Sequence, residues 1–274
     1  MTPLSLEAPA KLNLSLRVVG RRDDGHHLLD SHFVLLDLAD RLLLLPGCSG
    51  LRVEGRRDPA VPVDETNLAW RGLVAGLEGE PDLVCLALEK AIPAAAGLGG
   101  GSSDAAAAWR LGRAWRGRDD VASAGDLVAL SGIGADVPFF AAAVAAARVT
   151  GIGEQVDPIP AEPMHVVLVH PGFGLSTGAV FGELRADEWG RQPNDLLAPA
   201  QRLRPELAEI MAAVSRAGGE PRLTGSGPTI FSLTSDPERA TAVADRIAAD
   251  GLRATMSRTR SAPAAIQPIE EEDE

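Results

Sequence analysis

The sequence predicts an α+β protein of two domains. Strand-like segments dominate the first half of the 274-residue chain, whereas the second half alternates strands with helices. Between the halves, three prolines at 158, 160 and 163 mark a linker or domain edge. We therefore expect one domain over residues 1–160, a second over 161–266, and a disordered acidic tail at 267–274.

In the first domain, strands come first and helices follow. Alternating apolar residues beside turn signals such as Asp23-Asp24-Gly25 predict strands over 4–8, 12–19, 32–38, 41–45, 50–54 and 83–89. Helical spacing predicts helices over 67–77, 102–116 and 122–130, the first of them capped by Thr66. Asp136 should lie between the last helix and a further strand.

The second domain follows the order strand, helices, two strands, helix, strand. The expected strands span 165–169, 221–223, 229–233 and 253–257, and the expected helices span 176–184, 205–217 and 237–249. This order is typical of a ferredoxin-like α+β domain.

Charge and composition exclude several classes of protein. The net charge is −12, and the five acidic residues that close the chain leave −7 for the remainder. A body this acidic binds phosphate backbones poorly, so we expect no nucleic-acid partner. No apolar run approaches the roughly 18–20 residues that cross a bilayer, so we expect no membrane partner. The oligomeric state stays open.

The two cysteines, Cys48 and Cys85, are too few for a disulfide framework or a four-cysteine zinc site, and neither lies in a CxxC motif. The N-terminus lacks the basic and apolar regions of a secretion signal. We therefore expect a cytoplasmic protein.

The glycine-rich segment IPAAAGLGGGSSD, residues 92–104, predicts an anion site. Its four glycines let the backbone approach a ligand, and the helix that follows offers unpaired N–H groups to a phosphate. Ser102 and Ser103 add hydroxyls for phosphate or metal. The segment lacks the lysine of a Walker loop, and Ser102 stands where a dinucleotide fingerprint needs glycine. A flexible capped turn is the alternative, and Asp104 suits a structural role in the first helical turn.

Lysine is rare in this chain, which draws attention to Lys11 and Lys90. Arginine supplies 24 of the 26 basic residues, so a lysine indicates a place that needs a compact ammonium. Lys11 interrupts an apolar strand, and Asp136 is a lone carboxylate among apolar neighbours. If the two meet beside the phosphate site, they form a phosphoryl-transfer constellation. A solvent-facing carboxylate is the alternative for Asp136. For Lys90, just before the glycine-rich segment, we expect a solvated strand end, with a nucleotide contact as the alternative.

Together these segments resemble the GHMP small-molecule kinases. The resemblance runs through APAKLNLSL, GRRDDGHHLLDSHFVLLDLADRL, PAAAGLGGGSSDAA, GADVPFF, HPGFGLST, NDL and LTGSGPTIF, which span nearly the whole chain. It implies a first domain like the second domain of ribosomal protein S5 and a ferredoxin-like second domain. It also implies ATP beside the glycine-rich segment, Mg²⁺, and an acceptor with a cytidine diphosphate group in the cleft between the domains.

The resemblance also assigns residues. It implies Asp136 as the catalytic base and Lys11 as its partner. It implies ATP contacts from Pro93, Gly97, Leu98, Gly99, Gly100, Gly101, Ser102, Ser103 and Asn67, with Ser103 or Asp136 as a metal ligand. It implies acceptor contacts from Asn13, His26, His27, Ile152, Thr177, Phe181, Gly225 and Ser226.

One position departs from the family pattern. His26 stands where the family commonly has a tyrosine that stacks on the cytosine, and the chain contains no tyrosine at all. Imidazole offers a smaller flat face, so we expect weaker stacking. Three alternatives stay open: a mevalonate- or homoserine-type kinase of the same family, a non-catalytic binding protein on this fold, and an RNA-binding module.

Overall fold

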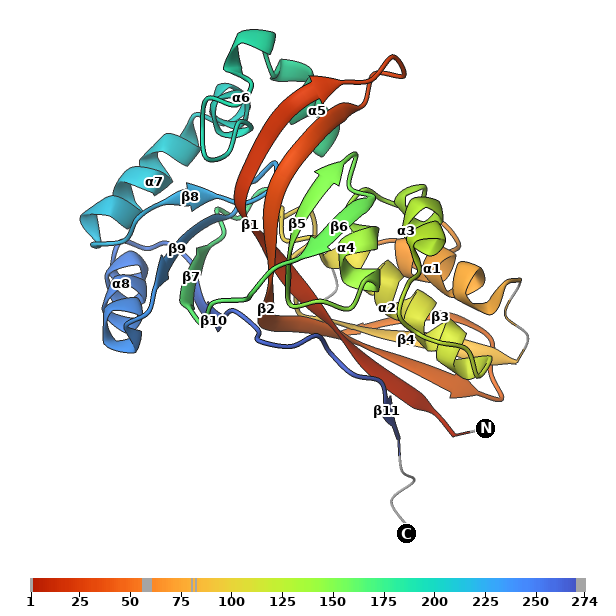
Figure 1. Ribbon diagram of the computed structural model, residues 1–274. Coiled ribbons are helices and arrows are strands. Elements are labelled where there is room, and N and C mark those ends of the chain that lie inside the picture. Colours follow the sequence, from red (N-terminus) through yellow and green to blue (C-terminus); the bar gives the residue numbers. More distant parts are fainter. Residues whose placement is uncertain (1, 56–60, 80, 82, 270–274) are drawn as a thin grey trace.

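Two β-sheets with their helices form the molecule in this computed structural model, which describes residues 2–55, 61–79, 81 and 83–269 (Figure 1). The larger sheet contains β1 (Leu4–Arg21), β2 (His27–Pro46), β3 (Gly50–Gly55), β4 (Val84–Lys90), β5 (Ala146–Gly151), β6 (Gln155–Pro158) and β11 (Gln267–Pro268). The smaller sheet contains β7 (His165–Val169), β8 (Arg222–Leu223), β9 (Ile230–Thr234) and β10 (Ala254–Arg258).

β1 and β2 form one long antiparallel hairpin at the centre of the larger sheet. The strand order is β11-β1-β2-β4-β3, with β5 paired to β2 and β6 paired to β5. Among the described strands of this sheet, only β3 and β4 pair in parallel. Each long strand was predicted as two. Pro9 does not end β1, because the pairing with β2 only shifts register between Pro9 and Lys11.

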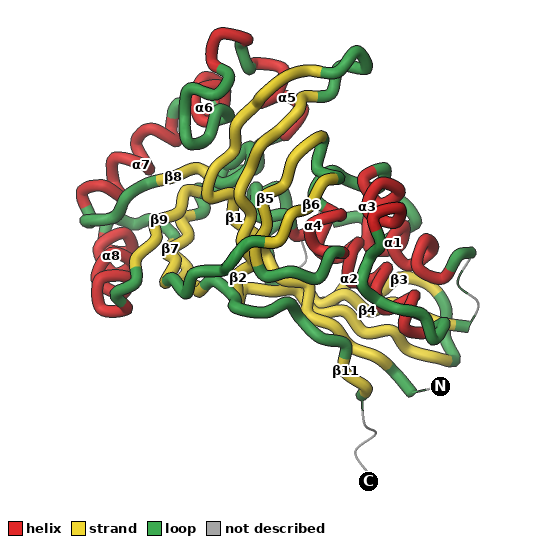
Figure 2. Tube along the Cα trace, viewed as in Figure 1, coloured by secondary structure: helices red, strands yellow, loops and turns green. Residues whose placement is uncertain are grey.

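Helices cover one face of this sheet: α1 (Leu68–Leu77), α2 (Gly100–Trp115), α3 (Ala124–Ser131) and α4 (Val137–Ala141) (Figure 2). α1 and α2 pack so closely that only glycine fits at position 72: a Cβ there would lie 2.0 Å from the Ala105 carbonyl oxygen. The side chain of Asn67, and not of Thr66, caps α1 by accepting from the Ala69 N–H. We expected a strand directly after Asp136, but the helix α4 begins there instead.

The smaller sheet confirms the ferredoxin-like second domain. Its order, β10-β7-β9-β8, is antiparallel throughout. Its helices are α5 (Thr177–Glu183), the short η1 (Ala186–Glu188), α6 (Leu197–Leu203), α7 (Glu206–Arg216) and α8 (Pro237–Ala249). The sequence pattern had not indicated η1 or α6 as separate elements.

The β1–β2 hairpin belongs to both halves of the molecule. Its lower part packs in the core under α1 and α2 through residues such as Leu6 and Leu42, whereas Leu16 near its tip joins the core of the second domain with Val180 and Leu223. The hairpin therefore fixes the position of one domain against the other (Figure 1).

The C-terminal segment crosses back to the first domain, which corrects the predicted boundary at 266. Arg260 donates its N–H to the Leu35 carbonyl, Ile266 packs against the first core, and β11 pairs with β1. Residues 267 and 268 are thus part of the sheet, because the edge of β1 offers them hydrogen bonds. The rest of the expected acidic tail, 270–274, lies outside the described residues.

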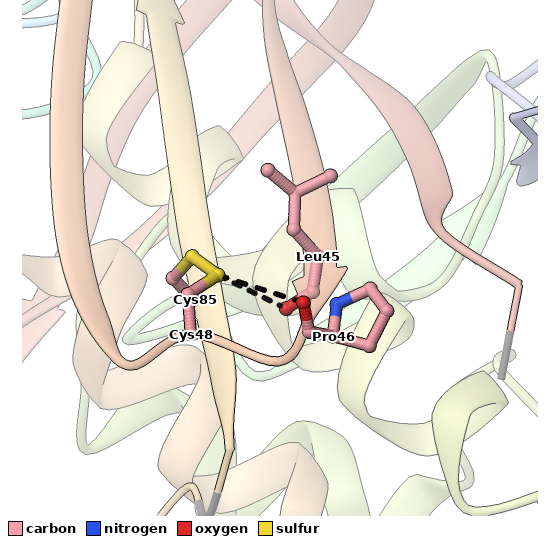
Figure 3. The surroundings of a disulfide bond; sticks show 4 residues. All are labelled: Leu45, Pro46, Cys48 and Cys85. Atoms are coloured by element: carbon pink, nitrogen blue, oxygen red, sulfur yellow. Dashed lines mark hydrogen bonds between the residues drawn. A yellow bond between two sulfur atoms is a disulfide. The ribbon is translucent and has the colours of Figure 1, made fainter. Parts of the chain in front are cut away.

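Cys48 and Cys85 form a disulfide, a pairing that their spacing in sequence had not predicted (Figure 3). The turn after β2 brings Cys48 over β4, and the Cα atoms lie 5.3 Å apart, as a disulfide requires. Leu45 and Pro46 flank the bond, with the Cys48 sulfur 3.6 Å from the Leu45 carbonyl oxygen. Among the described residues, we find no helix with the length and apolar character needed to cross a bilayer.

Candidate active site

A cavity of about 510 Å³ opens where the glycine-rich segment faces the β1–β2 hairpin and α5. Most of the residues expected to form the site line it. These are Lys11, Asn13, Asn67, Pro93, Gly97, Leu98, Gly99, Gly100, Gly101, Ser102, Asp136, Thr177, Phe181, Gly225 and Ser226. Four do not: Ser103, His26, His27 and Ile152.

The start of α2 provides the amide groups of the site. Gly99 precedes the helix with φ +72°, and no side chain caps the helix. The first intrahelical bond runs from the Ser103 N–H to the Gly99 carbonyl, so the N–H groups of 100–102 have no acceptor within the helix. These groups and the positive end of the helix dipole are a suitable place for an anion.

Gly97 sits against the loop 224–227 of the second domain. A Cβ at this residue would lie 2.6 Å from the Thr224 carbonyl oxygen and 2.8 Å from that of Gly227, and its φ is +76°. Only glycine fits both the conformation and the space. This loop, with Gly225 and Gly227, is a second glycine cluster; it packs directly against the first cluster, Gly97 to Gly101, and both clusters contribute residues to the cavity wall.

Lys11 and Asp136 meet at the wall of this cavity. The Lys11 Nζ lies 3.5 Å from the Asp136 Oδ2. The lysine side chain is only 3% exposed, whereas that of Asp136 is 32% exposed. Asp136 directly precedes α4 but its side chain does not cap that helix. Its carboxylate therefore faces the cavity with Lys11 as neighbour, and can accept a proton there.

A buried hydrogen-bond network holds Lys11 in place. Its Nζ donates to Asn13 Oδ1 at 2.6 Å and to the Gly97 carbonyl at 3.2 Å, while Asn13 Nδ2 donates to Ser31 Oγ at 2.9 Å. The Asn13 N–H donates to Thr224 Oγ1. Sequence reasoning missed Ser31, because a single serine in a strand is common and its partners are distant in the chain.

A second buried ionic cluster lies under the glycine-rich loop. Lys90 donates to both Asp104, at 2.7 Å, and Asp40, and Asp40 also accepts the N–H groups of Ala91 and Ile92. Burial raises the pKa of Asp104 to about 8, against the opposing attraction of Lys90. Burial would lower the pKa of Lys90, but the two carboxylates outweigh it and raise that pKa. The expected solvated strand end at Lys90 is wrong.

Aromatic rings form the end of the site near α5. The His27 ring stacks on Phe181, with centroids 5.1 Å apart and an angle of 23° between the planes. Burial, and then the charge of Arg21, lower the pKa of His27. His26 points away, with its side chain 66% exposed, and the Ile152 N–H donates to Glu154.

Comparison with known proteins identifies the family. The GHMP kinases N terminal domain matches residues 67–147, and the GHMP kinases C terminal domain matches residues 178–252. A protein of Paracoccus denitrificans named 4-diphosphocytidyl-2-C-methyl-D-erythritol kinase is 40% identical over 264 residues, 88% of this chain and 90% of its own. The chain belongs to the GHMP kinase family.

Further relatives of this GHMP kinase agree. A Thermus thermophilus protein with the same name is 38% identical over 90% of this chain and 92% of its own. A crystal structure of 4-(cytidine 5'-diphospho)-2C-methyl-D-erythritol kinase superposes with a TM-score of 0.76 and 35% identity over 93% of this chain and 98% of its own. Homoserine kinase from Cytophaga hutchinsonii, at TM-score 0.69 and 17% identity over 98% of both chains, shares the fold.

Ser103 does not suit the metal role expected for it in this GHMP kinase. It lies on the face of α2 that packs into the protein, where its Oγ is buried without a hydrogen-bond partner among the described residues. Ser102, one position earlier, faces the cavity instead. Within the described part of the chain, no group of three or more His, Cys, Asp or Glu residues could hold a metal by itself.

Proposed function

We propose that this GHMP kinase transfers the γ-phosphate of ATP to the 2-hydroxyl of 4-diphosphocytidyl-2-C-methyl-D-erythritol. The product would serve the non-mevalonate route to isoprenoid precursors. The observation that carries the proposal is the pair of Lys11 and Asp136, 3.5 Å apart beside the glycine-rich loop. The names of relatives at 35–40% identity supply the acceptor.

The glycine-rich loop would hold the triphosphate. The free N–H groups at 100–102 can donate to phosphate oxygens, and the Ser102 hydroxyl lies on the same side. Asn67 and Pro93 line the part of the cavity where the adenosine would lie.

Asp136 would take the proton from the attacking hydroxyl of the acceptor, and Lys11 would stabilise the negative charge that develops during transfer. Both side chains have fixed starting points: the Lys11 Nζ is held by two hydrogen bonds, and Asp136 directly precedes α4. Such placement favours in-line transfer, because the reacting groups need little rearrangement.

The acceptor would lie between the Lys11–Asp136 pair and α5. Asn13, Thr177 and Ser226 offer polar groups along this path, and Thr177 and Ser226 share a hydrogen bond of 2.9 Å between their hydroxyls. Phe181 lines the cavity, where its aromatic ring would stack on the cytosine. His27, stacked on that residue, would recognise the base by hydrogen bonding.

Mg²⁺ fits this donor set. The ion usually needs only one or two protein oxygens because ATP phosphates and water complete its shell. The Asp136 carboxylate and the Ser102 hydroxyl are both available in the cavity, and the Ser102 Oγ lies 3.4 Å from the place of a Cβ on Gly134, two residues from Asp136. Bound there, Mg²⁺ would neutralise phosphate charge. We also propose a cytoplasmic location, since ATP is available there.

An acceptor panel tests this function. Purified protein is given MgATP with 4-diphosphocytidyl-2-C-methyl-D-erythritol, mevalonate or homoserine, and ADP release is followed. We expect release only with the first acceptor, and a product phosphorylated at the 2-hydroxyl by NMR. Faster turnover of mevalonate or homoserine would refute the proposed acceptor while keeping the kinase.

A further inference from the structure

Trp189 is a large aromatic residue beside the acceptor site that sequence reasoning did not single out. It follows η1 and its ring meets the edge of the His27 ring, with centroids 5.8 Å apart and planes at 87°. His27 is therefore enclosed on two sides, with Phe181 parallel to it and Trp189 perpendicular to it. We call these three residues the aromatic corner.

The loop that carries Trp189 is firmly held. Asp195 is buried and accepts the N–H groups of Gly190 and Arg191 from this loop, and also the N–H of Val18 from β1. The Leu16 N–H donates to the Pro193 carbonyl at 2.8 Å. The loop and the strand that precedes His27 therefore form one hydrogen-bonded unit, which fixes Trp189 relative to the β1–β2 hairpin.

Stability alone does not account for a tryptophan at this position. The Trp189 Nε1 is buried and has no hydrogen-bond partner among the described residues. A buried donor without an acceptor costs stability, and a phenylalanine would give the same apolar contact without that cost. The wide indole ring is what this position offers to its neighbour His27.

We propose that Trp189 is a positioning residue of the acceptor site, whose indole holds the His27 imidazole on the face of Phe181 and so sets the affinity for a nucleobase. The inference rests on the proposed function, which makes His27 the base-recognising side chain. The exposed His26 contributes no ring to the aromatic corner. Trp189 contributes one instead, from the second domain.

Steady-state kinetics of Trp189→Ala, Trp189→Phe and the control Trp115→Phe test this role. Trp115 ends α2 and packs against the core between the helices and the larger sheet, and it does not line the cavity. Loss of one aromatic contact should raise the KM for the cytidine acceptor about three- to tenfold in Trp189→Ala. The kcat and the KM for ATP should stay within about twofold, and Trp189→Phe should recover only part of the acceptor affinity, because its ring is narrower than the indole.

Fluorescence supplies a second measurement, which does not need the alanine variant to fold. We expect the acceptor to change the tryptophan emission of the wild type and of Trp115→Phe, but not of Trp189→Phe. Three results would overturn the inference. In Trp189→Ala, the KM for the acceptor could stay unchanged, or kcat and the affinity for ATP could fall as much as the affinity for the acceptor. In Trp189→Phe, the acceptor could still cause the full change in emission. Wild-type protein that rejects the cytidine acceptor would instead overturn the proposed function.

Discussion

At the scale of single residues, Lys11 shows why this arginine-rich chain keeps a lysine. The stem of Lys11 packs on the backbone of Gly99, since a Cβ there would lie 3.0 Å from the Lys11 Cγ. Its Nζ fits between Asn13, Gly97 and Asp136. A planar guanidinium is wider than an ammonium and cannot occupy this space without displacing a neighbour.

We therefore expect Lys11→Arg to lower kcat by about 100-fold or more although the charge is kept. Arg148→Lys is the matched control, because Arg148 forms an exposed ion pair with Asp30 outside the cavity and should keep its activity. Steady-state kinetics and thermal unfolding of both variants check this. Wild-type turnover in Lys11→Arg would show that charge alone suffices at this position.

Asp104 gives the molecule a pH dependence with a definite sign. Its pKa is raised from 3.8 in the unfolded chain to about 8 in the fold, chiefly by burial. Between these values the folded state binds more protons than the unfolded state, so the free energy of unfolding should fall as pH rises. Asp104→Asn removes the titration. In urea unfolding at pH 5 to 8, the wild type should lose stability relative to this variant, and parallel profiles would contradict the assignment.

At the scale of elements, the two glycine clusters interlock. Gly97→Ala would place a methyl group 2.6 Å from the Thr224 carbonyl oxygen, in a left-handed conformation. We expect it to cost about 1–3 kcal/mol of unfolding free energy and to raise the KM for ATP. In Gly101→Ala the nearest atom would be Leu68 Cδ1 at 3.5 Å, and a helical alanine should not destabilise. Equal urea midpoints for the two variants would show that the clusters do not interlock.

The elements were predictable where the sequence has a clear period. The ferredoxin-like order and the helix after the glycine-rich segment followed from alternation, spacing and turn residues. β5, β6 and α4 were missed in a region where the alanines before β5 neither alternate nor show a helical face. β1 was divided at Pro9, although the pairing with β2 carries the strand through that residue.

The site was predictable only in part, for a related reason. Lys11, Asp136 and the glycines stand out by rarity or by their motif. Ser31, Asp40 and Trp189 do not, since each is an ordinary residue whose partner lies far away in the chain. Their roles arise from the fold, which brings each of them against a partner far away in the chain.

At the scale of the whole molecule, the β1–β2 hairpin joins both domains and carries one side of the site. Lys11 and Asn13 lie where it passes from the first core to the second, and the loop 224–227 meets them there from the second domain. The first domain contributes Asp136 and the glycine-rich loop, and the second contributes α5. The cavity therefore depends on both domains, and its geometry on the hairpin between them.

The central claim is that Lys11 and Asp136 act as one catalytic unit. The most direct measurement is a double-mutant cycle of kcat with MgATP and the cytidine acceptor, using Lys11→Met, Asp136→Asn and the double variant. We expect each single change to lower kcat by about 1,000-fold, and the double variant to be about as slow as the worse single variant. Full activity in Asp136→Asn, or two losses that multiply in the double variant, would contradict the claim.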